Sequence, residues 1–202
     1  MRASTSSVWE ERARDRALSV VLPLLESEGY DKIQLADVAE KARMSLATIY
    51  KYFPSRDELL VAAVERWMDE NAYQFPPLRD EPIFDALMRI YRKIFEPWEE
   101  HPRMLEAYVR ARASGHGSRL LAHGEAAVIP VTREIMSGLD PAFAEDLGMI
   151  IMHVNFSVYT HVASGQMKIS EILPTFERTL SRLLNPERPA NSKARTNTTT
   201  RR

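Results

Sequence analysis

Apolar residues return at helical spacing along nearly the whole chain, and no convincing alternation of apolar and polar residues marks a strand. The chain contains only seven glycines. The pattern therefore predicts an all-α protein. Its first helix is expected at about 9–28, with Gly29 as a stop signal and one apolar face. That face carries Ala17, Leu18, Val21, Leu24 and Leu25. Pro23 is expected to kink this helix or loosen its hydrogen bonds, because proline has no amide hydrogen to donate.

Two short helices are expected next, at 34–42 and 45–52, with a break of about three residues between them. Ser45 is a good N-cap for the second helix, because its hydroxyl can accept a hydrogen bond from a free backbone amide. Ser55 is placed to cap a long helix at 56–73 in the same way, and two acids favour the first turn of that helix.

Proline-rich sequence at 75–82 marks a boundary between regions of the chain. Further helices are predicted beyond it at 82–99, 102–113, 118–137, 141–165 and 170–184. We assign 1–55 to an N-terminal three-helix domain with a flexible arm at 1–8, and 56–185 to a C-terminal helical domain. Residues 186–202 are expected to form a disordered tail, because they include almost nothing apolar.

Charge is unevenly distributed along the chain. The net charge is −1, so the chain as a whole lacks the basic character of many nucleic-acid-binding proteins. Residues 1–60 hold nine basic and ten acidic groups. Within 41–56, however, four basic residues occur without one acid, namely Lys41, Arg43, Lys51 and Arg56. Any case for nucleic acid binding is therefore local.

Other features of the composition narrow the class of protein. There is no cysteine, which excludes disulfides and thiolate metal sites. No apolar run approaches the roughly 20 residues needed to cross a bilayer, so we predict no membrane association and a cytoplasmic location. The five histidines do not form a His-Glu-x-x-His zinc pair. We predict no bound metal and no cofactor.

The two short helices are typical of a helix-turn-helix, whose second helix lies in the major groove of DNA. Ile49 and Phe53 belong to the inward stripe. The opposite face of the second helix presents Ser45, Thr48, Lys51 and Tyr52. Positive charge there would offset the phosphates, and the hydroxyl groups would hold the helix in register. The alternative is an ordinary exposed amphipathic helix.

The stretch GYDKIQLADVAEKARMSLATIYKYFPSRDELL (29–60) resembles the N-terminal signature of the TetR family of bacterial transcriptional regulators. The shared features are a Gly-aromatic stop, a helix ending in an Ala pair, a small-residue turn, a Tyr-x-x-Phe and a basic residue opening the next helix. The resemblance covers about 9–60, and it implies a DNA-binding domain followed by a ligand-binding and dimerisation domain. The DNA-facing residues that it implies are Gln34, Ser45, Leu46, Ala47, Thr48, Tyr50, Lys51, Tyr52 and Arg56.

Two positions depart from the family pattern. Gln34 replaces the usual threonine, which weakens the cap of the first short helix. Ala36 stands where a basic residue is often found, so one backbone contact to DNA is missing from the expected set. The role of Tyr50 is open, since both structural packing and a phosphate contact suit it.

The C-terminal region is rich in methionine and aromatic residues, which can line an irregular apolar pocket. The predicted pocket residues are Met88, Tyr91, Phe95, Trp98, Met104, Tyr108, Met152, Phe156 and Tyr159. Ordinary core packing is the alternative for each of them.

The helix at 141–165 is apolar nearly all round and needs two partners, one in its own domain and one in a second subunit. We predict a two-fold dimer through a four-helix interface with the last helix, as the resemblance also implies. The predicted interface residues are Ile151, Val154, Val158, Phe176, Leu180 and Leu183.

These features predict a ligand-responsive DNA-binding regulator, expected to be a homodimeric repressor that a small hydrophobic effector releases from a palindromic, double-stranded operator. Activation is compatible with the same sequence. The stretches HPRMLEAYVRARAS and IQLADVA also resemble the actinobacterial branch of the family that controls sterol and lipid catabolism, which would imply a hydrophobic or acyl-thioester inducer.

Two other classes of protein remain as alternatives: a helical protein-interaction module without DNA binding, and a small all-α enzyme. Glycine-rich phosphate loops and the Gly-x-Ser-x-Gly elbow are missing, so we predict that the chain is not an enzyme.

Overall fold

The computed structural model describes residues 5–185, with side chains from Val8 onward. This range contains nine α-helices, three short 3-10 helices and no strand, in agreement with the all-α prediction. The start of the predicted arm, 1–4, and the predicted tail, 186–202, lie outside the described residues. No helix within 5–185 is both long and apolar enough to cross a bilayer.

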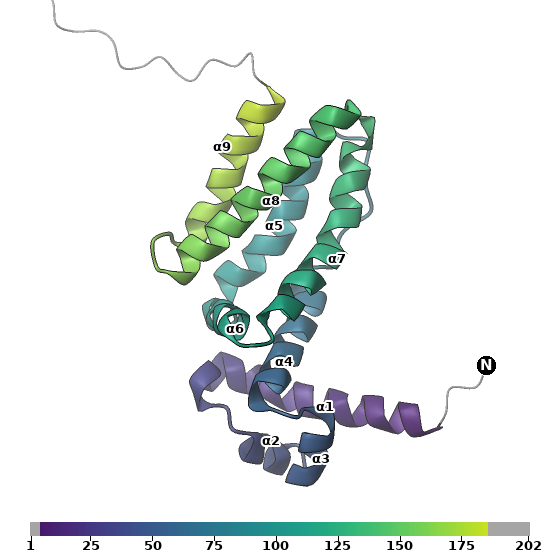
Figure 1. Cartoon of the computed structure of the whole chain (residues 1–202), viewed down its shortest axis with the longest axis vertical. Helices are drawn as coiled ribbons and strands as arrows, with labels where there is room; N and C mark the ends of the chain where they lie inside the picture. The colour runs from purple at the N-terminus through teal and green to yellow at the C-terminus, as the bar shows by residue number, and fades with distance from the viewer. Residues whose placement is uncertain (1–4, 186–202) are drawn as a thin grey trace, which may run out of the picture.

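The N-terminal part consists of one long helix, two short ones and a connecting helix (Figure 1). Their bounds are α1 Thr5–Glu28, the 3-10 helix η1 Tyr30–Lys32, α2 Leu35–Lys41, α3 Leu46–Tyr52 and α4 Arg56–Asn71. α1 begins four residues before the predicted start, so residues 5–8 are helical and do not belong to a flexible arm. It also continues through Pro23 to Glu28.

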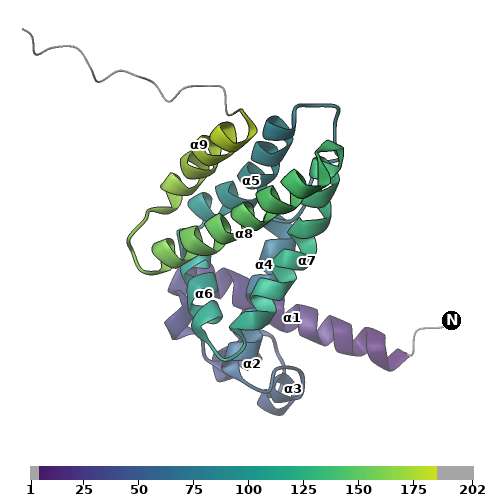
Figure 2. The same cartoon turned by 45° about the horizontal axis from the view of Figure 1, so that its top comes forward.

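The C-terminal part contains five further α-helices. Their bounds are α5 Ile83–Glu100, α6 Pro102–Ala113, α7 Gly117–Ile135, η2 Met136–Gly138, α8 Pro141–Ala163, η3 Ile169–Glu171 and α9 Ile172–Leu184. α9 lies beside α5, and α8 crosses in front of α5 in both views (Figures 1 and 2). Every one of these helices was predicted to within three residues at each end.

The N-terminal core forms where the apolar stripes of α1, α2 and α3 meet α4. Ala17, Val21 and Leu25 of α1 are fully buried. Val38 of α2 and Ile49 of α3 are fully buried against the same core. Burial of this apolar surface fixes which face of α3 points inward, and therefore which face is left for a partner.

α4 connects the two parts, since it packs on α1 on one side and on α6 and α7 on the other. The ring of Trp67 on α4 lies 4.3 Å from the ring of Trp98 on α5. The corner between α6 and α7 needs a glycine, because a Cβ on Gly117 would lie 1.9 Å from the carbonyl oxygen of Arg112. The short helices α2 and α3 at one end are thus joined to the C-terminal helices through a continuous core.

Candidate nucleic-acid interface

The start of α3 is fixed by a side-chain cap. The backbone amide of Thr48 donates to Ser45 Oγ at 3.0 Å, as the sequence predicted. The hydroxyl oxygens of Ser45 and Thr48 are 2.7 Å apart, so these two side chains also bind each other. Ser55 caps α4 in the same manner, accepting from the amide of Glu58 at 3.1 Å.

The turn between α2 and α3 depends on an unusual backbone conformation at Arg43. Its φ of 53° lies in the left-handed region, which glycine occupies more readily than a residue with a Cβ. The amide of Met44 donates to the carbonyl of Ala39 at 2.9 Å and closes the end of α2. This tight turn holds α2 and α3 as a helix-turn-helix pair.

Most of the residues predicted to face DNA lie on one exposed surface of α2 and α3. Gln34, Ser45, Leu46, Ala47, Tyr50 and Lys51 are exposed, while Thr48, Tyr52 and Arg56 are half-buried. Tyr50 is 49% exposed, so its ring is not part of the buried core and its hydroxyl is accessible to a partner. Leu46 is 41% exposed and offers apolar contact of the kind that thymine methyl groups accept.

A groove of about 410 Å³ runs between the N-terminal ends of α2, α3 and α4. Its lining consists of Gln34, Leu35, Ala36, Leu46, Tyr50, Pro54, Ser55 and Arg56. Five of these were predicted from the sequence as DNA-facing or as a departure from the family pattern: Gln34, Ala36, Leu46, Tyr50 and Arg56. The structure therefore brings four of the nine predicted residues, Gln34, Leu46, Tyr50 and Arg56, together around one concave surface, whereas the other five do not line it.

Arg56 lines this groove, but part of its half-buried side chain binds backbone groups of the protein itself. Its Nε donates to the carbonyl of Ile33 at 2.7 Å, and one of its terminal nitrogens donates to the carbonyl of Tyr30. The guanidinium carbon also lies 4.8 Å from the centre of the Tyr30 ring. Arg56 therefore fastens the turn before α2 to the start of α4, and two of its nitrogens donate hydrogen bonds there.

Two lysines of the basic stretch are paired with acids from α1. Lys51 Nζ is 3.1 Å from Glu10 Oε1, and Lys41 Nζ is 3.4 Å from Glu28 Oε1. The hydrogen bond that Lys51 donates to the Glu10 carboxylate raises the pKa of Lys51. The sequence did not reveal this, because α1 brings both acids back toward α2 and α3. Among the described residues, Arg43 is the basic side chain of 41–56 for which no acid lies within 4.0 Å.

The predicted ligand pocket is divided by the structure. Six of its residues, Met88, Tyr91, Phe95, Trp98, Met104 and Tyr108, are buried together, and Tyr159 is half-buried beside them. Their rings form a continuous aromatic cluster, for example Phe95 to Tyr159 at 5.6 Å and Trp98 to Tyr108 at 5.2 Å. Met152 and Phe156 do not join this cluster. They are 51% and 59% exposed on the outer face of α8, so their assignment to an internal pocket is corrected.

The predicted dimer residues are also placed differently. Ile151 and Val158 of α8, and Phe176 and Leu180 of α9, are buried inside the single chain. The ring of Phe176 stacks on that of Tyr91 at 4.1 Å. Val154 and Leu183 are half-buried. The four buried side chains therefore serve their own subunit, and α9 packs on α5. The outer face of α8 carries the exposed Met149, Met152 and Phe156.

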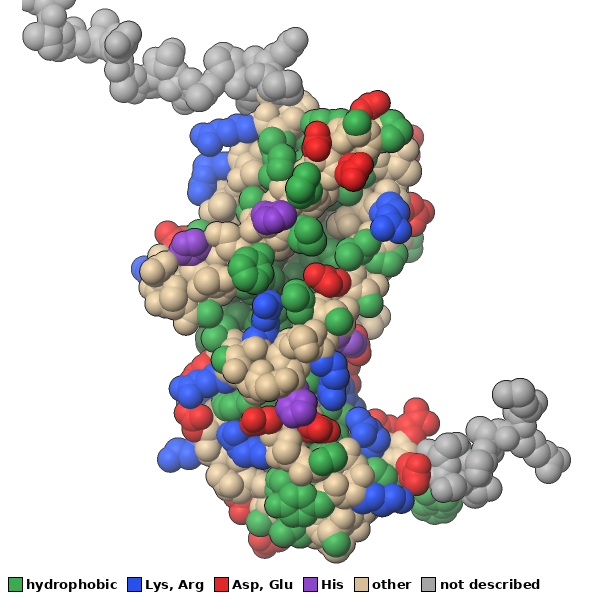
Figure 3. Space-filling model, viewed as in Figure 1, with side chains coloured by type: hydrophobic (Ala, Val, Ile, Leu, Met, Phe, Trp, Pro, Cys, Tyr) green, Lys and Arg blue, Asp and Glu red, His purple; other side chains and the backbone are tan. Residues whose placement is uncertain are grey.

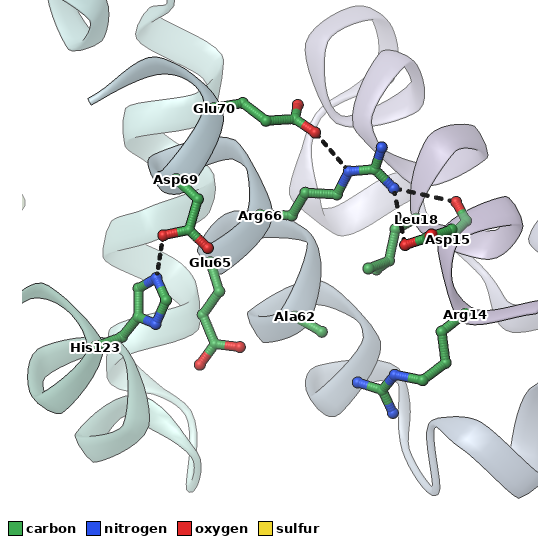
Figure 4. Close-up of a pocket in the computed structure, with 9 residues that line it drawn as sticks. All are labelled: Arg14, Asp15, Leu18, Ala62, Glu65, Arg66, Asp69, Glu70 and His123. Carbon is green, nitrogen blue, oxygen red and sulfur yellow. Dashed lines mark hydrogen bonds and ion pairs between the residues drawn. The ribbon is translucent and has the colours of Figure 1, made fainter. Parts of the chain in front are cut away.

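A second groove of about 410 Å³ lies between α1, α4 and α7, and nearly all of its lining is charged (Figure 4). Arg66 of α4 binds Glu70 at 2.7 Å and contacts Asp15 of α1 at 3.6 Å. His123 of α7 is 2.8 Å from Asp69 of α4. The charged side chains that line this groove are paired with one another and join the three helices. They are therefore not free to bind a ligand. No cluster of three metal-ligating side chains occurs in the part of the chain that the structure describes.

Comparison with known proteins connects this geometry to a family. The profile of bacterial regulatory proteins of the tetR family matches residues 18–63, and the profile "Tetracyclin repressor-like, C-terminal domain" matches residues 81–183. A TetR transcriptional regulator from Rhodococcus sp. RHA1 has a similar fold, with a TM-score of 0.67 over 87% of this chain and 98% of that one, at 20% identity. A tetR-family regulator from Streptomyces coelicolor gives a TM-score of 0.63 over 86% and 81% of the two chains, at 21% identity.

Related sequences are also named as transcription regulators. The HTH-type transcriptional repressor KstR of Rhodococcus jostii is 33% identical over 108 residues, which cover 52% of this chain and 50% of that protein. The HTH-type regulator Rv1556 of Mycobacterium tuberculosis, described as uncharacterized, is 42% identical over 106 residues, covering 52% and 50%. The chain spans about half the length of the curated relatives it matches. The relatives and solved structures described above are all named as transcription regulators. With both profiles matched, the chain belongs to the TetR family of bacterial regulatory proteins.

Proposed function

We propose that this protein is a ligand-responsive transcriptional regulator that binds a palindromic operator as a homodimer, and that a small hydrophobic effector releases it from DNA. The observation that carries the proposal is the exposed surface of α2 and α3. Gln34, Leu46 and Tyr50 line one groove there, and Ser45 and Lys51 of the same short segment are also exposed. A short helix with hydroxyl, apolar and cationic side chains on its free face has what direct reading of a major groove requires.

Dimerisation is supported by the outer face of α8. Met149, Met152 and Phe156 follow at spacings of three and four residues, so they form one apolar stripe on a helix with only three buried residues. Such a stripe exposes a contiguous apolar surface of the kind that marks protein interfaces. In Figure 3 hydrophobic side chains gather on this face of the C-terminal part. A second copy placed here would present two α3 helices about 34 Å apart, or a multiple of that distance, on successive turns of DNA.

Repression is favoured over activation by the printed descriptions of the KstR relatives as repressors. The effector is expected in the C-terminal part, among the buried aromatic and methionine side chains around Phe95 and Tyr108. Cytoplasmic location follows from the proposed role, because the operator lies on the chromosome.

The test is selection of bound fragments from genomic DNA with purified protein, followed by titration of the selected fragment. We expect a palindromic site and a linear fall of log K with log salt. Lys51→Ala should weaken binding to all sequences and lower the salt slope by about 1, whereas Thr48→Ala should change the preference among sequences. If no fragment is selected, or if neither variant alters binding, α3 is not the reading helix and the protein-interaction alternative gains support.

A further inference from the structure

The interior of the C-terminal part contains one cluster of hydrogen-bond donors. Arg112 of α6 directs Nη1 to the hydroxyl oxygen of Tyr108 at 3.4 Å, and its guanidinium carbon lies 6.0 Å from the centre of the Tyr108 ring. That ring is 5.5 Å from the ring of Tyr159 on α8. One turn before Tyr159, the side-chain amide of Asn155 donates to the hydroxyl of Tyr91 on α5 at 3.4 Å. Side chains from α5, α6 and α8 thus meet here.

The cluster carries a positive charge that no acid of the described residues balances. Arg112 is half-buried, and no Asp or Glu oxygen between residues 8 and 185 lies within 4.0 Å of its guanidinium nitrogens. By contrast, Arg89 of α5 and Arg119 of α7 are each paired with a glutamate. A partly buried cation without a counter-charge is costly, so this group would gain from an anionic partner.

The hydroxyl groups of the cluster remain neutral donors. Burial raises the pKa of Tyr91, Tyr108 and Tyr159 above the usual value, so all three keep their protons at neutral pH. The surroundings are apolar: Phe95 lies 5.6 Å from the Tyr159 ring, and Trp98 lies 5.2 Å from the Tyr108 ring. In the space-filling view, this face is hollowed between α7 and α8, with hydrophobic side chains in the hollow (Figure 3).

We propose that Arg112 and the hydroxyl groups of Tyr108 and Tyr159 bind the carboxylate of an apolar effector, whose hydrocarbon part lies against the aromatic cluster. This inference rests on the proposed function and specifies the chemical class of the effector. The charge complementarity of an unpaired guanidinium for a carboxylate, together with neutral phenol donors beside it, selects an anionic head group over a neutral one. α6 and α8 would then be joined by the ligand.

The experiment compares two probes of equal chain length, decanoate and decan-1-ol, by calorimetry and by tryptophan fluorescence of the full chain. Trp98 is a suitable reporter because its ring contacts that of Tyr108. We expect decanoate to bind about tenfold or more tightly than decan-1-ol, since a charge-assisted contact is roughly twice as strong as a neutral one. Arg112→Gln should remove this preference, and Arg112→Lys should retain part of it. The matched control is Arg92→Gln, an exposed arginine of α5, which should leave the preference unchanged.

Circular dichroism and thermal unfolding of each variant separate a lost contact from a lost fold. Equal affinity for the two probes, a preference that survives in folded Arg112→Gln, or no saturable binding of either probe would overturn the inference. Should Arg112→Gln fail to fold, Tyr159→Phe takes its place and should reduce the preference for decanoate. Operator binding by the unaltered protein is measured separately. Absence of DNA binding would contradict the proposed function, whereas DNA binding without a preference for decanoate would contradict only this inference.

Discussion

Arg119 of α7 forms a bidentate ion pair with the carboxylate of Glu65 on α4. Nε lies 2.6 Å from Oε1 and Nη2 lies 2.8 Å from Oε2. One turn further along both helices, His123 contacts Asp69 at 2.8 Å. The two pairs are separated by four residues on α4 and by four residues on α7, so two successive turns of one helix bind two successive turns of the other. α4 begins at the groove that it shares with α2 and α3, and α7 belongs to the C-terminal part.

A double-mutant cycle on Glu65→Gln and Arg119→Gln should give a coupling energy of about 0.5–1 kcal/mol for unfolding, because the pair is bidentate but Arg119 is substantially solvated. Urea titrations of the four proteins measure it. Arg133→Gln, an exposed arginine on the same helix, is the control and should not couple to Glu65. A coupling energy indistinguishable from zero would show that the Glu65–Arg119 ion pair does not contribute to stability.

Glu10→Gln should increase affinity for DNA by about two- to fivefold at low salt, because it frees Lys51 from its ion pair with α1. The steepness of the salt dependence should increase as well, since one more lysine becomes available to phosphates. Glu11→Gln removes the same charge from an exposed position one residue away and serves as the control. Fluorescence anisotropy with a selected fragment measures both. Equal gains in the two variants would attribute the effect to net charge alone.

Arg56→Gln should destabilise the N-terminal part by about 1–3 kcal/mol, because the carbonyls of Tyr30 and Ile33 lose a charged donor. The control is Arg43→Gln, which also removes one positive charge from this domain but breaks no ion pair or hydrogen bond of a described side chain. Urea unfolding followed by circular dichroism distinguishes them. A normal unfolding midpoint for Arg56→Gln combined with weak DNA binding would restore the sequence-based role of Arg56 as a phosphate contact.

Stability should fall in alkaline solution because of the buried tyrosines. Burial raises the pKa of Tyr91, Tyr108 and Tyr159 from the ordinary value of 10.0. A folded-state pKa above the unfolded one means that stabilisation is complete below pH 10 and is lost as the pH rises toward the folded-state value. The free energy of unfolding should then decrease by up to about 1.4 kcal/mol per pH unit for each tyrosine.

Urea titrations at pH 8, 10 and 11 test this behaviour. Tyr91→Phe removes one titrating group, so its stability should decline less steeply above pH 10 than that of the unaltered protein. Parallel curves for the two proteins would exclude Tyr91 as a source of the alkaline loss.

Phe156→Glu should raise the dissociation constant of the proposed dimer by about a hundredfold or more, because each subunit would place a charge on the shared apolar face. Sedimentation velocity at micromolar concentration measures the effect. Trp9→Glu, an exposed aromatic on α1, is the matched control. A monomeric unaltered protein, or a dimer that persists in Phe156→Glu, would locate the interface elsewhere.

Local chemistry explains why the helices could be predicted from the sequence. Ser45 and Ser55 cap α3 and α4 as expected, because an N-cap depends on residues three positions apart. The partners of Lys51 and Arg56 could not be found in that way. Glu10 and the carbonyl of Tyr30 are distant in sequence and reach these side chains only through the packing of α1 and the turn that follows it.

The two stripes of α8 show a different limit. Ile151 and Val158 point into the domain, whereas Met152 and Phe156 point out, which reverses the roles predicted from the sequence. A helix that is apolar on all sides has no polar face to orient it, so periodicity identifies the stripes but not their directions. Only the position of α5 and α9 decides which stripe is covered.

The exposed stripe around Phe156 also bears on how the protein would act at low abundance. In the proposed dimer each chain contributes one α3 helix, so a lone chain would contact only one half of a two-fold operator. Below the dissociation constant of the pair, the concentration of paired chains grows with the square of the total. Halving the concentration of chains would then lower the concentration of dimers nearly fourfold, and the occupancy of an unsaturated operator would fall with it. Operator binding by the proposed dimer would therefore be sensitive to the expression of its own gene.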